Sequence, residues 1–250
     1  MSYFDHLKIY KDNIALVTSK EKIKYNRLLS YSDDISKNIE ERTLVILICK
    51  NSVESIAAYI SFVKSGCVVL LFDNKLNEES FKNLINTYEP NYVFLPKNKF
   101  SCKINYESIY DFNNYELLKK QKYKKHELNY ELALLMPTSG SMGASKFVRQ
   151  SYENIKCNIH QIDDYLKIKH SDCSITTMPM NYTYGLSIIH THLAKGASLA
   201  LSEDGLMSKH FWNFFQNTKV TNFGGVPYIY EILKKLNFKE KKLKRYNKVY

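Results

Sequence analysis

The sequence lacks any apolar run long enough to cross a membrane. Its best continuous apolar run, residues 67–72, has the length of one strand, whereas a membrane helix needs roughly 20 apolar residues. The first twelve residues mix acids with bases and show no apolar stretch typical of a signal peptide. Repeats and low-complexity tracts are also missing. With 44% hydrophobic and 24% charged residues, the 250-residue chain has a globular composition, which excludes a disordered tail, a collagen-like repeat and a coiled-coil rod.

The sequence also lacks the residue spacings of common metal and redox sites. Its five cysteines lie far apart, and no two of them have the two-residue spacing of a zinc knuckle or a redox motif. The seven histidines show neither metal-ligand spacing nor the pattern of a catalytic triad. We therefore expect buried, reduced thiols in a cytoplasmic protein, and no metal site within this chain.

Positive charge is in excess, with 36 Lys and Arg against 25 Asp and Glu and a formal net charge of +11. Two interpretations stay open. A basic α/β module would bind nucleic acid through the lysine-rich segments 119–125 and 234–248. The other interpretation, which we favour, is that an A/T-rich coding sequence produces the bias toward Lys, Asn, Ile and Tyr. The first lysine segment is then a solvated loop and the second a solvated helix face.

The order of the expected strands and helices indicates an α/β fold. Residues 43–49 and 67–72 are apolar runs of the kind found in strands that are buried on both faces of a parallel sheet. Between them, Ser52 is expected to cap a helix that continues to about residue 64 and ends before Gly66. Further strands are expected at 14–18, 23–25, 91–95, 131–136, 146–150, 173–178, 197–201 and 220–226, and further helices at 25–39, 78–88, 153–168, 184–194, 209–217 and 227–236.

The weakest signals lie at residues 97–128, which we interpret as a seam. The expected organisation is a first α/β lobe over residues 1–128 and a second over residues 129–250.

A loop rich in serine and glycine follows the strand expected at 131–136. Between Thr138 and Lys146 it combines three hydroxyl groups near its start, two glycines and a final lysine. Glycine lets the main chain approach a ligand, successive amides form an anion-binding concavity, and lysine supplies a point charge. The loop is not a Walker A motif, because Ser145 stands where that motif has glycine, and it lacks the Gly-x-Gly of a dinucleotide-binding fingerprint. Composition alone leaves two alternatives, a polyphosphate cradle or a mobile connector.

Four stretches resemble, in order and spacing, the motifs of the adenylate-forming (AMP-binding) superfamily, which includes acyl-CoA synthetases, luciferases and peptide-synthetase adenylation domains. The loop Thr-Ser-Gly-Ser-Met-Gly-Ala-Ser-Lys at 138–146 resembles the family's phosphate loop. Residues 63–73, 178–186 and 225–233 are similar to its Leu-Lys-Ala-Gly segment with the following strand, its Leu-Pro-Leu-Phe-His-x-Tyr-Gly-Leu stretch and its Gly-Val-Pro helix start. The resemblance covers essentially the whole chain. It implies the N-terminal portion of that fold, with layered, largely parallel sheets flanked by helices.

The resemblance implies an ATP-dependent ligase that converts a small carboxylate or amino acid to an acyl-adenylate. A thiol of coenzyme A or of a carrier protein's pantetheine then takes the acyl group. ATP and Mg are the cofactors expected of the full enzyme, since two anions meet and preorganised donors with a metal ion must neutralise the charge. The residues implied for ATP and pyrophosphate binding are Thr138, Ser139, Gly140, Ser141, Gly143 and Lys146. The residues implied for the substrate pocket are Tyr182, Tyr184, Gly185, Gly224, Gly225 and Val226.

Several positions depart from the family pattern. Met142 removes a hydroxyl donor where the family has Thr, and Ser145 and Phe147 replace the usual Pro and Gly. Tyr182 stands where many acyl-CoA synthetases have His, and a tyrosine does not change charge near neutral pH.

The chain ends at Tyr250, in a stretch that resembles the family strand leading into a Gly-Gly turn. In the family, the adenine and ribose contacts, the metal-binding glutamate and the mobile C-terminal lid with its catalytic lysine come later. We therefore expect an N-terminal fragment, without a complete catalytic set or a metal ligand, that does not complete adenylation alone. A non-catalytic remnant is the remaining alternative.

Overall fold

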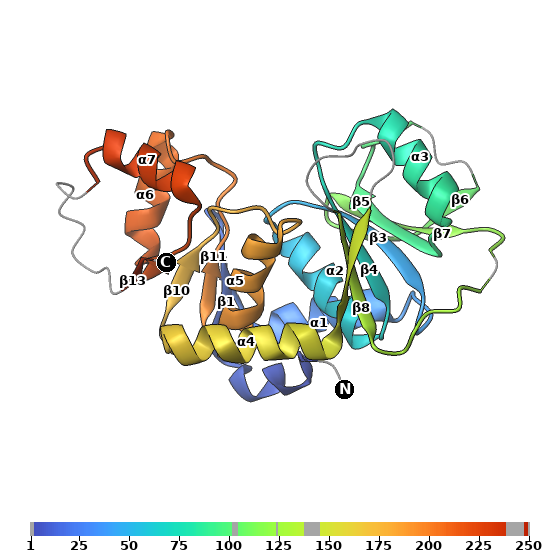
Figure 1. Cartoon of the computed structure of the whole chain (residues 1–250), viewed down its shortest axis with the longest axis horizontal. Coiled ribbons are helices and arrows are strands. Elements are labelled where there is room, and N and C mark those ends of the chain that lie inside the picture. Colours follow the sequence, from blue (N-terminus) through green and yellow to red (C-terminus); the bar gives the residue numbers. More distant parts are fainter. Residues whose placement is uncertain (1–2, 102–104, 124, 138–145, 239–247, 250) are drawn as a thin grey trace. The chain divides into compact units, whose positions relative to one another are not determined.

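The computed structural model describes residues 3–101, 105–123, 125–137, 146–238 and 248–249, in which strands and helices alternate (Figure 1). The chain forms two compact units, each with its own sheet. Unit 1 comprises Met1–Asp5 and Leu29–Cys157, and unit 2 comprises His6–Leu28 and Asn158–Tyr250. The boundary expected between residues 128 and 129 falls inside unit 1, because the strand that follows it joins the sheet of that unit.

The sheet of unit 1 has seven strands in the order β6-β7-β5-β3-β4-β8-β9. Four neighbouring strands, β5, β3, β4 and β8, are parallel, whereas β7, β6 and β9 pair antiparallel at the two sides. The strands are β3 (Leu44–Cys49), β4 (Val68–Asp73), β5 (Tyr92–Pro96), β6 (Tyr106–Phe112), β7 (Tyr115–Lys120), β8 (Leu132–Pro137) and β9 (Phe147–Ser151). The parallel centre confirms the fold class predicted from the alternation of strands and helices.

The connection between β3 and β4 forms as the sequence predicts. Every residue of β3 is buried, as is β4 up to its last residue, because apolar side chains occupy both faces of these strands. Helix α2 (Val53–Lys64) joins them, and its N-cap Ser52 accepts a hydrogen bond from the Ser55 amide. This cap satisfies one of the amides that the first helical turn leaves without a partner.

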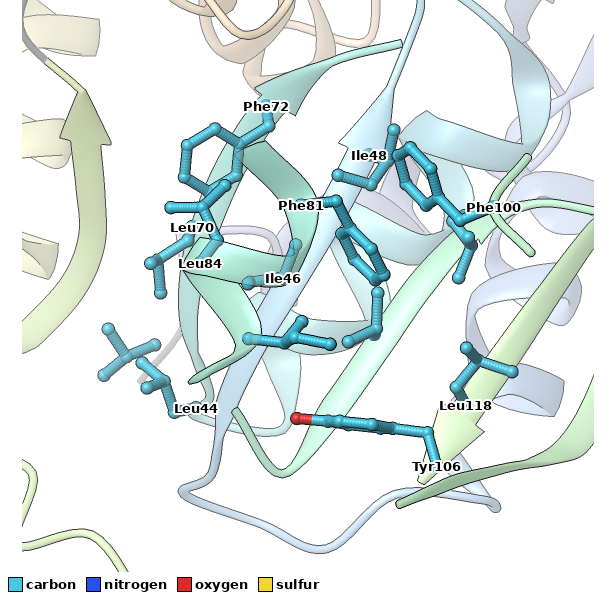
Figure 2. Packing of buried hydrophobic residues seen from close by; sticks show 14 residues of the cluster. Leu44, Ile46, Ile48, Leu70, Phe72, Phe81, Leu84, Phe100, Tyr106 and Leu118 are labelled. Carbon is cyan, nitrogen blue, oxygen red and sulfur yellow. The ribbon is translucent and has the colours of Figure 1, made fainter. Parts of the chain in front are cut away.

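One face of this sheet packs against α3 (Glu78–Tyr88) in a single apolar cluster, shown in Figure 2. Alternate side chains of β3, Leu44, Ile46 and Ile48, point into it, and Phe81 stacks on Phe100 with ring centroids 4.1 Å apart. Burying each such side chain stabilises the unit by about 1.5–3 kcal/mol, before the loss of chain entropy is counted.

The seam predicted at residues 97–128 is wrong in its middle part, which forms the antiparallel hairpin β6–β7. Asn113 and Asn114 make its two-residue turn, and Asn113 takes a positive φ of 52° that asparagine tolerates. Lys119 and Lys120 lie on β7 rather than in a solvated loop. The Asn-Asn pair between two segments of alternating apolar and polar residues was the signal that would have found this hairpin.

The sheet of unit 2 has the order β13-β12-β10-β11-β1-β2, and all its pairings are parallel except that of β1 with β2. Its strands are β1 (Ile14–Val17), β2 (Lys22–Lys24), β10 (Cys173–Ile175), β11 (Ser198–Ala200), β12 (Asn222–Phe223) and β13 (Lys248–Val249). Helix α5 (Thr183–Ala194) contacts β10 and β11, as Figure 1 shows. The unit also contains η1 (Asp5–Tyr10), α6 (Lys209–Thr218) and α7 (Pro227–Lys235). Two long helices, α1 (Tyr25–Ser36) and α4 (Tyr152–Leu166), contribute residues to both units.

The cysteines that the structure describes are free thiols. Cys49, Cys67 and Cys173 are buried as predicted, and burial raises the pKa of each of these thiols. Cys157 is an exception to that prediction, because it lies on an exposed face of α4. Cys102 lies outside the described residues. None of the described helices has the length and apolarity needed to cross a membrane.

Candidate functional site

The candidate phosphate loop connects β8 to β9 in unit 1. The carboxyl ends of the parallel strands β5, β3, β4 and β8 lie at one edge of the sheet, and the loop leaves from that edge after Pro137. Its two ends are held together by the β8–β9 ladder, which pairs Pro137 with Phe147. Ligands of open α/β sheets bind at this edge. Thr138, Ser139, Gly140, Ser141 and Gly143 lie outside the described residues, whereas Lys146 is described and exposed.

Phe147, which follows Lys146 directly, anchors the end of the loop to the core of unit 1. Its ring meets Phe72 edge to face at 6.0 Å between centroids and Tyr88 at 5.1 Å. This contact gives a physical reason for the departure from the family's glycine. The aromatic ring restricts the main chain of the residue that follows Lys146.

We expect Phe147→Ala to lower the free energy of unfolding of unit 1 by about 1–2 kcal/mol, because a half-buried ring loses its two aromatic neighbours. Urea unfolding followed by far-ultraviolet circular dichroism measures this change. Val148→Ala is the matched control, since Val148 is the next residue along the strand and is 50% exposed. Equal unfolding midpoints for the two variants would contradict the anchoring role of Phe147.

Arg42 positions the start of β8, a role that the sequence did not reveal. Its guanidinium donates hydrogen bonds to the carbonyl oxygens of Gly66 at 2.6 Å and Leu132 at 3.0 Å, and also to that of Asn129. These bonds connect the segments that precede β4 and β8. Because Arg42 lies far along the chain from each of these partners, no local pattern indicates the contact.

In unit 2, the residues expected to line the substrate pocket follow two neighbouring parallel strands. The segment after β10 and the segment after β12 leave from the same edge of the sheet, since these strands are parallel. The Thr177 hydroxyl donates a hydrogen bond to the Gly224 carbonyl oxygen and joins the two segments. Tyr184 lies in the first turn of α5, and its hydroxyl oxygen would lie 2.6 Å from a Cβ at Gly224. The structure therefore brings Tyr184 and Gly224 together.

Tyr184 also contacts the next residue of the second segment. Burial raises the pKa of the Tyr184 phenol, and a backbone hydrogen bond from Gly225 partly opposes this rise. A bond that favours the phenolate must be donated to its oxygen, so the Gly225 amide is the donor. The Tyr184 hydroxyl keeps its own proton, which a phenol can donate to an acceptor.

The remaining predicted residues lie at the starts of the two helices. Tyr182 is the N-cap residue of α5 and its side chain is 49% exposed, whereas Val226 is the N-cap residue of α7. Gly185 is buried, and a Cβ there would lie 2.2 Å from the Pro179 carbonyl oxygen. Only glycine permits this close approach of α5 to the preceding segment.

Tyr230 is a residue of this region that the sequence analysis did not single out. It lies one turn into α7, and the charge of an ionised Tyr184 would raise its pKa further after burial has raised it. The signal in the sequence was Pro227, which marks the start of the helix. The residue three positions later, Tyr230, then lies on the same side of the helix as Pro227.

The described residues contain no group of three or more His, Cys, Asp or Glu side chains that would hold a metal ion. The residues that suit ATP are the hydroxyls, amides and lysine of the 138–146 loop, because these groups donate hydrogen bonds to phosphate oxygens or balance their charge. Of these residues the structure describes Lys146, which is exposed.

Comparison with known proteins identifies the class. The model of the AMP-binding enzyme family matches residues 4–249, so the chain belongs to that family. A 2-succinylbenzoate–CoA ligase of Bacillus cytotoxicus is 25% identical over 203 residues, which are 76% of this chain and 40% of the relative. A D-alanine–D-alanyl carrier protein ligase of Staphylococcus aureus is 21% identical over 202 residues, 79% of this chain and 41% of the relative. The chain thus spans about two fifths of the length of these relatives.

Solved structures show the same fold. Apo MatB from Rhodopseudomonas palustris matches with a TM-score of 0.73 and 18% identity, over 94% of this chain and 51% of MatB. The N-terminal domain of FACL13 from Mycobacterium tuberculosis, in an inhibitor-bound crystal structure, matches with a TM-score of 0.77 and 13% identity, over 99% of this chain and 69% of that one. These likenesses confirm the predicted fold class.

Proposed function

We propose that this chain supplies the phosphate-binding and acyl-binding parts of an ATP-dependent ligase that activates a carboxylate as its acyl-adenylate. The observation that carries the proposal is the position of Pro137, after which the 138–146 loop begins. This residue ends β8 at the carboxyl edge of the parallel strands, in a chain that belongs to the AMP-binding enzyme family. The hydroxyls and amides of Thr138, Ser139, Gly140, Ser141 and Gly143 are proposed to hold the pyrophosphate end of ATP together with Lys146.

The chemistry assigns a separate task to each unit. In unit 1, Lys146 reduces the repulsion between a carboxylate and a phosphoryl group, both of which are negative. Mg, bound with ATP in the complete enzyme, would supply further charge neutralisation. In unit 2, the segments after β10 and β12 are proposed to hold the acyl group, with Tyr182, Tyr184, Gly185, Gly224, Gly225 and Val226 as its lining.

The thiol acceptor is proposed by analogy with the relatives. One of them is named for coenzyme A and the other for a carrier protein, so the acceptor is either coenzyme A or a carrier-protein pantetheine. Because ATP and these thiols are cytosolic, the proposed reaction belongs in the cytoplasm. Since the chain spans about two fifths of these relatives, its inability to complete adenylation alone stays a prediction.

The nucleic-acid alternative is weakened because acidic residues pair with two lysines of its first basic segment, residues 119–125. Lys119 forms an ion pair with Glu40 at 3.0 Å, and Lys120 forms one with Glu89 at 2.9 Å. Hydrogen bonds from Tyr123 and then from Lys119 lower the pKa of Glu40, which keeps this carboxylate ionised. Paired lysines contribute less to binding of a phosphate backbone than unpaired ones, and we therefore favour the ligase.

The proposed function predicts that Lys146→Ala weakens ATP binding to residues 1–250 by about 10- to 100-fold, the effect of losing one charge-assisted hydrogen bond. Isothermal titration calorimetry at 50 mM and 200 mM salt measures the affinity, and the weakening should be smaller at higher salt. Lys156→Ala is the control, because Lys156 is exposed on α4 and outside the loop. Failure of the unmodified chain to bind ATP or pyrophosphate, or equal affinities of the Lys146 and Lys156 variants, would reject the proposal.

A further inference from the structure

Tyr230 places a buried hydroxyl group beside Tyr184, and no described residue forms a hydrogen bond with it. The Tyr230 ring packs against the apolar cluster of unit 2, whereas its hydroxyl oxygen is buried and unpaired. A hydroxyl in this position has lost its bonds to bulk water without replacement, and buried polar groups in native proteins are almost always paired. A ligand atom or an ordered water at this oxygen would remove the deficit.

The two tyrosines together present hydrogen-bond donors. Burial raises the pKa of both phenols, so both stay protonated at neutral pH. The Tyr184 oxygen already accepts the Gly225 amide hydrogen, and its own proton is therefore available to donate. The ligand group that suits this pair is an oxygen acceptor.

The charged groups near the two tyrosines also bear on whether an amino acid would bind there. In the described part of the chain, the influences on these two phenols are burial, the Gly225 main chain and Tyr184 acting on Tyr230, with no carboxylate among them. Tyr106 in unit 1 is different, since Glu89 contributes to its raised pKa. Among the described residues, no carboxylate acts on the tyrosine pair as Glu89 acts on Tyr106, so none of these residues would attract the ammonium group of an amino acid there.

The volume next to the Tyr184 and Tyr230 pair is limited. A Cβ at Gly224 would lie 2.6 Å from the Tyr184 hydroxyl and 2.8 Å from Cδ1 of Ile188, so these side chains lie directly on the Gly224 main chain. They occupy the volume that a long acyl tail would need beside the end of β12. A short acyl chain is compatible with this packing.

We propose that Tyr184 and Tyr230 select a short carboxylic acid that carries a second oxygen acceptor, a hydroxyl or a second carboxylate. This inference rests on the proposed function, and it excludes purely apolar acids and amino acids as preferred substrates. Tyr230 is the specificity-determining residue, because its unpaired hydroxyl gains a partner only when such an acid binds.

Four acids with four-carbon chains test the inference by calorimetric titration of residues 1–250 in the presence of ATP. These acids are butanoate, 3-hydroxybutanoate, succinate and 4-aminobutanoate. We expect 3-hydroxybutanoate and succinate to bind about tenfold more tightly than the other two, the effect of about one hydrogen bond. Tyr230→Phe should abolish this preference. Tyr228→Phe should retain it, because Tyr228 lies in the same helix and is 66% exposed.

Three results would overturn the inference: equal affinities for the four acids, a preference that survives in Tyr230→Phe, or no binding of any acid. Titration of the same sample with ATP distinguishes a failure of this inference from a failure of the proposed function. If ATP binds and the binding depends on Lys146, the proposed ligase function is supported even when the inference about the acid is wrong. The thermal midpoint of Tyr230→Phe should equal or exceed that of the unmodified chain, because the substitution removes only an unpaired hydroxyl.

Discussion

Replacement of Gly185 by alanine is expected to destabilise unit 2 by about 3 kcal/mol. An added Cβ would lie 2.2 Å from the Pro179 carbonyl oxygen and 2.9 Å from that of Met178. Both neighbours are main-chain atoms, which cannot turn away as a flexible side chain would. Alanine favours a helix over glycine by about 1 kcal/mol, but a contact this short costs more, so the overlap decides the sign.

Urea unfolding followed by tryptophan fluorescence measures this effect in the correct unit. Trp212 is the only tryptophan in the sequence, and it lies on α6 of unit 2, where its indole N–H donates to the Leu206 carbonyl oxygen at 2.7 Å. Gly205→Ala is the control, because a Cβ at Gly205 has no neighbour within 4 Å, and its midpoint should stay close to that of the unmodified chain. An equally small change for Gly185→Ala would show that α5 does not approach Pro179 so closely.

Unit 2 is expected to lose about 1.4 kcal/mol of unfolding free energy between pH 7.5 and pH 5.5 because of His190. This side chain is 4% exposed on α5, and burial lowers its pKa to about 3. The unfolded chain binds the proton near pH 6.5, whereas the folded chain does not. The contribution is therefore complete above pH 6.5 and is lost progressively as the pH falls toward 3.

His190→Leu should remove this dependence of the unfolding free energy on pH, because leucine is apolar and does not titrate. His190→Met is the second variant if leucine does not fit the site. His170→Leu is the control, since His170 is exposed and its replacement should leave the pH dependence unchanged. The buried His192 is present in every variant, with its ring nitrogens 2.8 Å from the Ile188 carbonyl oxygen and 3.1 Å from Oδ1 of Asn222. A slope that persists in His190→Leu would assign the titration to another group.

The elements predicted well are those whose signal is local. Residues 43–49 and 67–72 form buried strands because their side chains are apolar on both faces, so neither face of the strand favours contact with solvent. Ser52 caps α2 because its hydroxyl satisfies an amide of the adjacent turn. The hairpin β6–β7 was missed because its polar, alternating residues carry a weak apolar signal, although the Asn113 turn was visible.

The candidate site was predictable in part. The resemblance to the AMP-binding superfamily marked the 138–146 loop, Tyr184 and Gly224 as site residues, and the structure places the last two in contact. Phe147 was noted as a departure, but its contacts with Phe72 and Tyr88 depend on strand register, which the motif does not contain. Tyr230 lies in the matching 225–233 stretch but was not singled out, because the burial of its hydroxyl without a partner among the described residues is a property of the folded chain.

The sequence by itself determined the family, the alternation of strands and helices and the candidate phosphate loop, since contiguous residues carry the signal for each of these. Only the tertiary structure decided which distant strands pair. Leu16 of β1 lies beside Leu199 of β11, although their local patterns carry no information about each other. It also decided that Tyr184, Gly224 and Tyr230 share one edge of a sheet. Burial, close approach and missing hydrogen-bond partners are properties of that shared environment, and no single segment contains them.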